Sequence, residues 1–514
     1  MTDPNITPQS VPDAVPQPAV VQRPEETKEL PKIDAAELPG MKFEDEKSQN
    51  VTPSRATVSP GTVNVNETCM FPSASSAYHE ALSRGFPSLR QLSSAEDRRW
   101  GATYLNSLWT NPADNALQSS LSREGSDWRQ GVHVNGELLR SQVPHYQAPV
   151  NKIVTGEQAL TLAYAHMEMG DIFHAGMWNS GFWVTFKPAP EPVWLNINRL
   201  LGADVVRLCR DTYGLLHSTA TSLTVSTIID AILPFVYATS VNPGEMAIND
   251  IPQHLKASDE LDFIWGFICA NYPRGFNIER SCLADPSKCR TVISEVIHPQ
   301  ELQWVDNAAL PEFCRSHMRN RGAGKMSLAN VKEYQERLDA HLGQVITIGK
   351  NRTTELTLSS PTSHQKRIMT EAYVEGIKSS VLSSVTDDVP MSQRESMYQE
   401  HMAATEMRMY QHWVSKIVFD SITVDKPEDI ANILGIWTRD NDLRVQFFEE
   451  MAKFLDKTSV SVLALQAVVC PNCGADHSSP TQIGLGKIDC VPIDIIQVFS
   501  LLAEFKTRVI SARA

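Results

Sequence analysis

A pair of cysteines two residues apart closes an apolar run near the C-terminal end of the sequence. The run Val460 to Val469 predicts a strand, and it leads directly into Cys470-Pro-Asn-Cys473-Gly. Two thiolates at this spacing can bind one ion from a tight turn, which Pro471 and Gly474 favour. The chain is therefore expected to build a strand that ends in a cysteine-bearing turn, called a cysteine knuckle below.

Two later residues can complete a four-ligand site with this pair. His477 follows Cys473 after three residues, and Cys490 lies farther along the chain. Three cysteines and one histidine form an accepted zinc ligand set, so the predicted metal ligands are Cys470, Cys473, His477 and Cys490, with structural zinc as the cofactor. The alternative is a reduced knuckle held by backbone hydrogen bonds. A redox pair is disfavoured because no thioredoxin-like strand-to-helix context surrounds it.

A second set of cysteine and histidine residues lies earlier in the chain. It consists of Cys282-x6-Cys289 and Cys314-x2-His317, which can also supply four ligands. The six-residue spacing is looser than that of a usual knuckle, and independent buried cysteines are the competing interpretation. A closed four-ligand site of either kind would stabilise the fold rather than catalyse a reaction.

Length and charge exclude several classes of protein. The chain has 514 residues, enough for two or three domains, and a formal net charge of −14. An acidic surface repels phosphate backbones, so a nucleic-acid partner is not expected. The beginning of the sequence lacks the basic and apolar runs of an export signal, and no apolar stretch is long enough for a membrane span. A reducing cytosol is expected, where clustered cysteines bind metal rather than form disulfides.

The expected fold is mainly α, of the α+β class: a multi-domain helical protein with short strands, cysteine knuckles and a disordered N-terminal tail. Ten prolines lie in the first sixty positions, and this segment cannot bury enough apolar surface to offset its ordering entropy. The predicted segments are a disordered acidic tail (1–74), a small helical and turn region (75–150), an α+β domain with the Cys282/Cys289 loop (151–326), a helical arm (327–420) and a C-terminal helix-strand-knuckle-helix module (421–514).

Local patterns predict individual elements within these segments. Alternating apolar residues and turn signals indicate strands at 181–187, 276–280, 291–297 and 460–469. Apolar residues at helical spacing indicate helices that include 195–213, 220–238, 365–384 and 391–417. Polar residues placed before apolar runs predict helix N-caps at Ser258, Ser327, Asp425 and Asp440.

Motifs typical of enzymes are not found. Gly322-Ala-Gly-Lys325 lacks the first glycine of a phosphate-binding loop, and methionine stands where that loop needs serine or threonine. His166 and His174 lie near acidic residues, but they lack the spacing of a His-Glu-x-x-His metal site. Satisfied or exposed histidines are the simpler interpretation, and the chain is expected not to be an enzyme.

Two stretches carry a resemblance to a known family. Asp262 to Cys282 forms a helix, a strand and a cysteine, and Leu463 to Cys473 repeats that ending before a predicted helix at 493–508. Both stretches resemble the baseplate hub and hub-assembly proteins of contractile-tailed bacteriophages. The shared order of elements also suggests an internal duplication, which sequence identity is too low to establish.

The resemblance implies a non-enzymatic structural component of a phage tail, in the baseplate hub or its assembly. Its partners would be other tail and baseplate proteins in an oligomeric assembly, and its location the virion tail, assembled in the host cytoplasm. Two alternatives stay open. One is a tail assembly chaperone that is absent from the mature virion, and the other is a metal-dependent enzyme with an unrecognised site.

Overall fold

The structure is a computed structural model that describes residues 62–64, 125–143, 170–209, 217–281, 291–343, 345–349, 353–384, 404–466, 470–474 and 490–492, with isolated residues or pairs of residues between and after these ranges. Residues 57–514 form one compact unit, to which all the elements below belong. The predicted disordered tail, 1–74, lies outside the described residues except for its short strand at 62–64.

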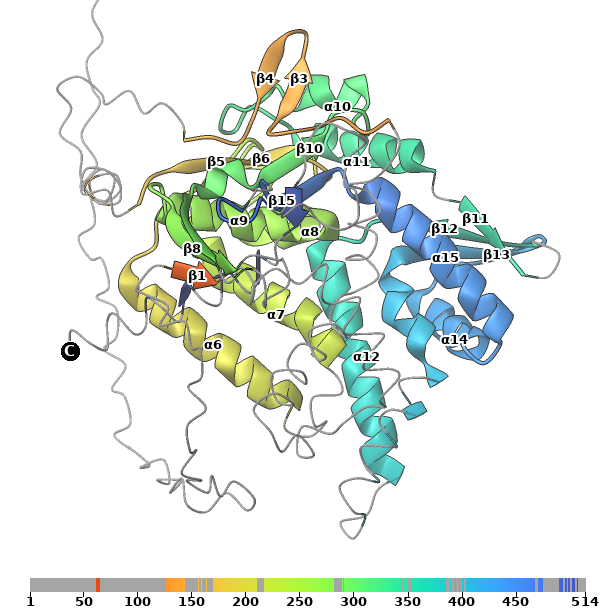
Figure 1. The fold of residues 1–514 in the computed structure, drawn as a ribbon. Helices are drawn as coiled ribbons and strands as arrows, with labels where there is room; N and C mark the ends of the chain where they lie inside the picture. Colours follow the sequence, from red (N-terminus) through yellow and green to blue (C-terminus); the bar gives the residue numbers. More distant parts are fainter. Residues whose placement is uncertain are drawn as a thin grey trace, which may run out of the picture. The chain divides into compact units, whose positions relative to one another are not determined.

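Small sheets and helices alternate along the chain, which confirms the predicted α+β class (Figure 1). The strands are β1 (Thr62–Asn64), β2 (Trp128–Arg129), β3 (Val132–Val134), β4 (Glu137–Leu139), β5 (Phe173–Met177), β6 (Phe182–Phe186), β7 (Val236–Thr239), β8 (Phe276–Ser281), β9 (Val292–Ile297), β10 (Gln303–Asp306), β11 (Val345–Ile348), β12 (Thr354–Leu358), β13 (Val414–Phe419), β14 (Ile422–Val424), β15 (Ser461–Gln466) and β16 (Cys490–Pro492).

The helices separate these strands in the sequence. The α-helices are α6 (Glu191–Cys209), α7 (His217–Ile232), α8 (Ile251–His254), α9 (Glu260–Asn271), α10 (Glu312–His317), α11 (Leu328–Leu342), α12 (Ser363–Ser384), α14 (Pro427–Trp437) and α15 (Asn441–Thr458). The 3-10 helices are η1 (Leu233–Phe235), η2 (Ile248–Asp250), η3 (Ala257–Asp259), η4 (Pro299–Glu301) and η5 (Glu406–Trp413). Among the described residues, no helix is long and apolar enough to cross a membrane.

The largest core packs α9 against the sheet β5–β6–β7. Trp265 on α9 meets Phe173 edge-on, with ring centroids 5.2 Å apart. Gly266 permits this close approach, because a Cβ there would lie 2.6 Å from the Phe186 ring. Ile495 and Phe499, from the C-terminal part of the chain, are buried in the same core. The predicted segments 151–326 and 421–514 therefore share one hydrophobic core.

A second core lies between the sheet β11–β12–β13–β14 and the helices α14 and α15. Leu356 and Ile417 pair across β12 and β13, and both are buried there with Phe447 of α15. The interval 327–420, expected to be a helical arm, thus contains strands β11, β12 and β13 as well as α11 and α12. The expected helix at 391–417 is wrong at its end, where η5 leads into β13.

Several local predictions are confirmed and others are wrong. Ser327 caps α11 by accepting a hydrogen bond from the Asn330 amide, and Asp440 caps α15 in the same way. Ser258 and Asp425 do not act as N-caps, since α9 begins after Asp259 and α14 after Lys426. The expected helix at 220–238 also ends early, and its last residues form β7 beside β6.

Candidate metal centre

Three cysteine sulfurs meet at the ends of two strands. Cys289 precedes β9, whereas Cys470 and Cys473 belong to the turn that follows β15. Their Sγ atoms all lie within 4.8 Å of one another, and those of Cys289 and Cys470 are 3.8 Å apart. This group, called the thiol cluster below, joins positions that are 181 residues apart in the chain.

The turn holding two of these cysteines is closed by its own backbone. The amide of Gly474 donates a 2.9 Å hydrogen bond to the carbonyl of Cys470. Gly474 has a φ of +69°, a conformation that glycine adopts without steric cost. The tight turn predicted from Cys470-Pro-Asn-Cys473-Gly is therefore present, and it brings the Cys473 sulfur back toward Cys470.

The surroundings of Cys289 favour its deprotonated form. Hydrogen bonds to the side chain and backbone of Thr291, then to Asn472 and Cys473, lower the pKa of the Cys289 thiol to about 6, against a smaller opposing effect of burial. The Thr291 hydroxyl lies 3.2 Å from the sulfur, and the Asn472 amide donates to it over 3.6 Å. The thiolate is the form of cysteine that binds metal, so Cys289 is prepared to act as a ligand at neutral pH.

The separations within the thiol cluster suit a tetrahedral ion. With bonds of about 2.3 Å to zinc, two sulfurs of a tetrahedral site lie about 3.8 Å apart. The Cys289–Cys470 separation already has this value, and the other pairs lie within 4.8 Å. Three close cysteines can therefore hold a metal ion after small side-chain movements.

The predicted ligand set is brought together only in part. Cys470 and Cys473 lie in the thiol cluster as expected. His477 lies outside the described residues. The backbone of Cys490 belongs to β16, where it pairs with Gln466 of β15.

The second predicted set is divided between two places. Cys289 lies in the thiol cluster, whereas Cys314 is fully buried in another core beside Tyr334, and burial raises the pKa of its thiol to about 12. The ring of His317 packs on Tyr334, and its Nε2–H donates to the Gly181 carbonyl over 2.8 Å. Cys314 and His317 therefore do not share a site with Cys289, and Cys282 lies outside the described residues.

His174 occupies a packed position. Its Nδ1 lies 2.9 Å from the Thr185 hydroxyl, and its ring stacks on Trp183 with centroids 4.8 Å apart. Burial, together with nearby Arg321, lowers the pKa of His174 to about 4. The imidazole is therefore neutral at physiological pH and held within the fold, and His166 lies outside the described residues.

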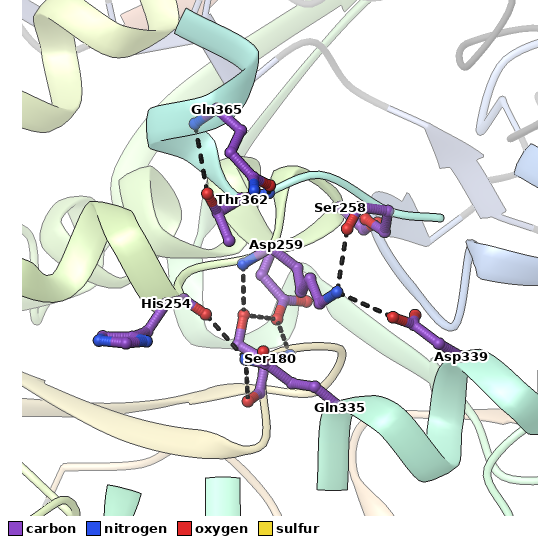
Figure 2. A network of polar contacts seen from close by, with 10 residues as sticks. Ser180, His254, Ser258, Asp259, Gln335, Asp339, Thr362 and Gln365 are labelled. Atoms are coloured by element: carbon purple, nitrogen blue, oxygen red, sulfur yellow. Dashed lines mark hydrogen bonds and ion pairs between the residues drawn. The ribbon is translucent and has the colours of Figure 1, made fainter. Parts of the chain in front are cut away.

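A separate cluster of buried polar groups surrounds Asp259 (Figure 2). The Asp259 carboxylate accepts hydrogen bonds from the backbone and side chain of both Asn179 and Ser180, at distances between 2.6 and 3.1 Å. Lys256 donates from its Nζ to Asp339 over 3.0 Å and to the Ser360 carbonyl over 2.9 Å. These residues are called the Asp259 network below.

The Asp259 network links α11 to the residues that follow β5 and to α8 through hydrogen bonds. The Gln335 side chain of α11 donates to the carbonyls of Ser180 and His254. Burial raises the pKa of Asp259, while its hydrogen bonds to Ser180 and Asn179 act in the opposite direction. The donors and acceptors are matched within the chain, which is the pattern of a structural junction.

Comparison with protein-family models, with curated proteins and with solved structures finds no match for this chain.

Proposed function

We propose that the thiol cluster binds one zinc ion, which fastens the turn after β15 to the residues that precede β9. The proposal rests on one observation: the sulfurs of three cysteines lie within 4.8 Å of one another, although Cys289 and Cys470 are 181 residues apart in the sequence. Soft thiolates select zinc over magnesium or calcium, and the tetrahedral separation of sulfurs is already present for one pair. The ion would act as a cross-link between distant segments.

A structural role agrees with the burial of the ligands. Cys289 and Cys470 are only 4% and 1% exposed, so two ligands are closed to solvent. A structural zinc ion takes four protein ligands, whereas a catalytic one keeps a position for water or substrate. The sequence offers Cys282, His477 and Cys490 as fourth ligands, and Cys282 directly follows the last residue of β8.

Zinc content of the full-length reduced protein and its variants tests this proposal. We expect one zinc per chain in the parent protein, and its loss in Cys289→Ser and Cys470→Ser. Cys314→Ala is the matched control, because Cys314 is equally buried but lies in another core. Retention of zinc in both serine variants, or no binding by the parent protein, would reject the site.

The fourth ligand can be assigned by replacing zinc with cobalt. Cobalt(II) bound by thiolates has sulfur-to-metal charge-transfer bands whose intensity rises with the number of sulfurs. The cobalt spectra of three variants should then differ from one another: Cys282→Ser, His477→Ala and Cys490→Ser. The variant that removes the fourth ligand should bind cobalt more weakly, and the other two variants should keep the spectrum of the parent protein. Equal spectra in all three variants would assign the fourth position to water.

The wider role that we propose is a non-enzymatic structural component of a phage tail, in the baseplate hub or its assembly. Its support is the resemblance of residues 262–282 and 463–473 to hub proteins, in which strands end in cysteine knuckles. A metal ion that links two such strand ends would stabilise the folded state, as a structural protein within an assembly requires. The partners would be other tail proteins.

Quantitative mass spectrometry of purified infectious particles, beside the infected-cell lysate, tests this role. A fixed ratio of this chain to known tail proteins in the particles supports a structural component. Abundance in the lysate with absence from particles favours the assembly chaperone. Absence from both, in an infected cell that encodes the chain, would reject both.

A further inference from the structure

The three sulfurs of the thiol cluster differ in their access to solvent. Cys289 and Cys470 are buried, whereas Cys473 is exposed in a turn whose residues 471–474 are all exposed. Cys473 is also a direct hydrogen-bond partner of Cys289. One sulfur is thus open to a soluble reagent, while a second, from a distant segment, lies within 4.8 Å of it.

We infer that the thiol cluster is redox-regulated: an oxidised low-molecular-weight thiol, such as glutathione disulfide, converts Cys289 and Cys473 into a disulfide and releases the metal ion. The inference rests on the proposed function for the ion that is released. A metal cross-link in a reducing compartment would be replaced by a covalent cross-link in an oxidising one. The two segments would stay joined in both.

The reaction consists of two thiol–disulfide exchanges. The Cys473 thiolate attacks one sulfur of glutathione disulfide, whose S–S bond breaks, and one glutathione leaves as a thiolate that takes up a proton. The Cys289 thiolate then attacks the Cys473 sulfur, and the second glutathione leaves in the same way. Two electrons pass from the cysteines to the glutathione disulfide, and the ion leaves because disulfide sulfurs are no longer thiolate ligands.

We assign Cys289 as the second sulfur because it is the hydrogen-bond partner of Cys473. Cys470 and Cys473 belong to one turn, and a Cys-x-x-Cys turn can also close a disulfide, so the experiment below separates the two pairings. A disulfide needs sulfurs about 2.05 Å apart with a torsion angle near 90°. Cys289 approaches Cys473 from a separate segment, so the exposed turn can adjust to meet it.

Peptide mapping without reduction tests the inference on the full-length protein. The reduced, zinc-loaded chain is treated with glutathione disulfide, alkylated and digested with trypsin, which separates Cys282 from Cys289 at Lys288. We expect a link between the Cys289 peptide and the peptide of Cys470 and Cys473, together with release of zinc. The link should persist in Cys470→Ser and disappear in Cys473→Ser and Cys289→Ser.

Other outcomes would overturn the inference. A disulfide confined to Cys470 and Cys473, a link that persists in Cys473→Ser, or stable glutathionylation of Cys473 would each contradict the proposed exchange. Zinc binding by the reduced protein without any Cys289–Cys473 link leaves the proposed function intact and rejects the switch. The link without prior zinc binding rejects the proposed function alone.

Discussion

The thiol cluster and the Asp259 network both join segments that are far apart in the sequence, but they are satisfied in different ways. Asp259 accepts four hydrogen bonds from Asn179 and Ser180, and all of these donors come from the chain itself. The thiol cluster gathers three sulfurs, which are weak hydrogen-bonding groups and good metal ligands. The comparison teaches that the hydrogen-bonding groups at Asp259 are satisfied within the chain, whereas three close cysteine sulfurs could in addition hold a metal ion.

The largest expected effect on stability comes from removing the Asp259 carboxylate. Asp259→Ala leaves four buried donors without an acceptor, and we expect the free energy of unfolding to fall by about 4 kcal/mol. Urea denaturation followed by tryptophan fluorescence measures this loss. The loss should be equal with and without a zinc chelator.

Asp425→Ala is the matched control, because Asp425 is exposed and lies outside the network. A fall of less than about 1 kcal/mol in Asp259→Ala would show that the network is not a main junction.

The next effect concerns the buried ion pair between Lys366 of α12 and Glu260 of α9. Lys366 Nζ lies 2.5 Å from Glu260 Oε2, and the Glu260 side chain is 2% exposed. Lys366→Met leaves a buried carboxylate unpaired, so we expect a loss of about 3 kcal/mol. Adding Glu260→Gln should recover much of that loss in a double-mutant cycle.

The surface pair Lys453–Glu450 is a control for ion pairing in general. Lys453→Met should cost less than about 1 kcal/mol, since exposed pairs contribute little. Equal losses in the two methionine variants would contradict the distinction between a buried junction and a surface contact.

Asp262 of α9 lies near Asp259 and contributes a pH dependence to the stability of the fold. Its carboxyl group accepts hydrogen bonds from Gln303 and from Ser461 of β15, and burial, with Asp259 nearby, raises its pKa from 3.8 to about 8. Between these values the folded state keeps a proton that the unfolded state has lost. The contribution of Asp262 to stability therefore falls as pH rises through this window and levels off above the folded pKa.

Asp262→Asn should remove this dependence. Between about pH 6.5 and 7.5 we expect the stability of the parent protein to change by about 1.4 kcal/mol less favourably than that of the variant, because other titrating groups contribute equally to both. Chemical denaturation at both pH values provides the measurement. Parallel profiles would show that Asp262 does not hold the extra proton.

The smallest expected effect concerns the zinc affinity of the thiol cluster. Thr291→Val keeps the side-chain shape but removes the hydroxyl that lies 3.2 Å from the Cys289 sulfur. We expect the zinc affinity to fall about tenfold, as for other groups that support a ligand. Competition with a chromogenic chelator measures it, and exposed Thr423→Val serves as the control.

Local signals in the sequence predict elements whose cause is local. The alternation at 181–187 gives β6, and the polar residues Ser327 and Asp440 cap α11 and α15. Strands that depend on distant partners are missed. β13 forms because it pairs with β12, although its own residues also fit a helix.

The same limit explains the mixed outcome at the thiol cluster. The spacing of Cys470 and Cys473 within one turn is visible in the sequence, because two residues fix their separation. The addition of Cys289 depends on how the chain brings positions 181 residues apart together, and spacing carries no information about that. The sequence therefore groups Cys289 with Cys282, Cys314 and His317, although the structure places Cys314 and His317 beside Tyr334.

Zinc K-edge X-ray absorption of the reduced, full-length protein tests the central claim most directly, since it reports the atoms bound to the ion. The account predicts a first shell dominated by sulfur, with at least three Zn–S distances of about 2.3 Å, and its loss in Cys470→Ser. A shell of oxygen and nitrogen alone, unchanged in that variant, would contradict a structural ion at Cys289, Cys470 and Cys473.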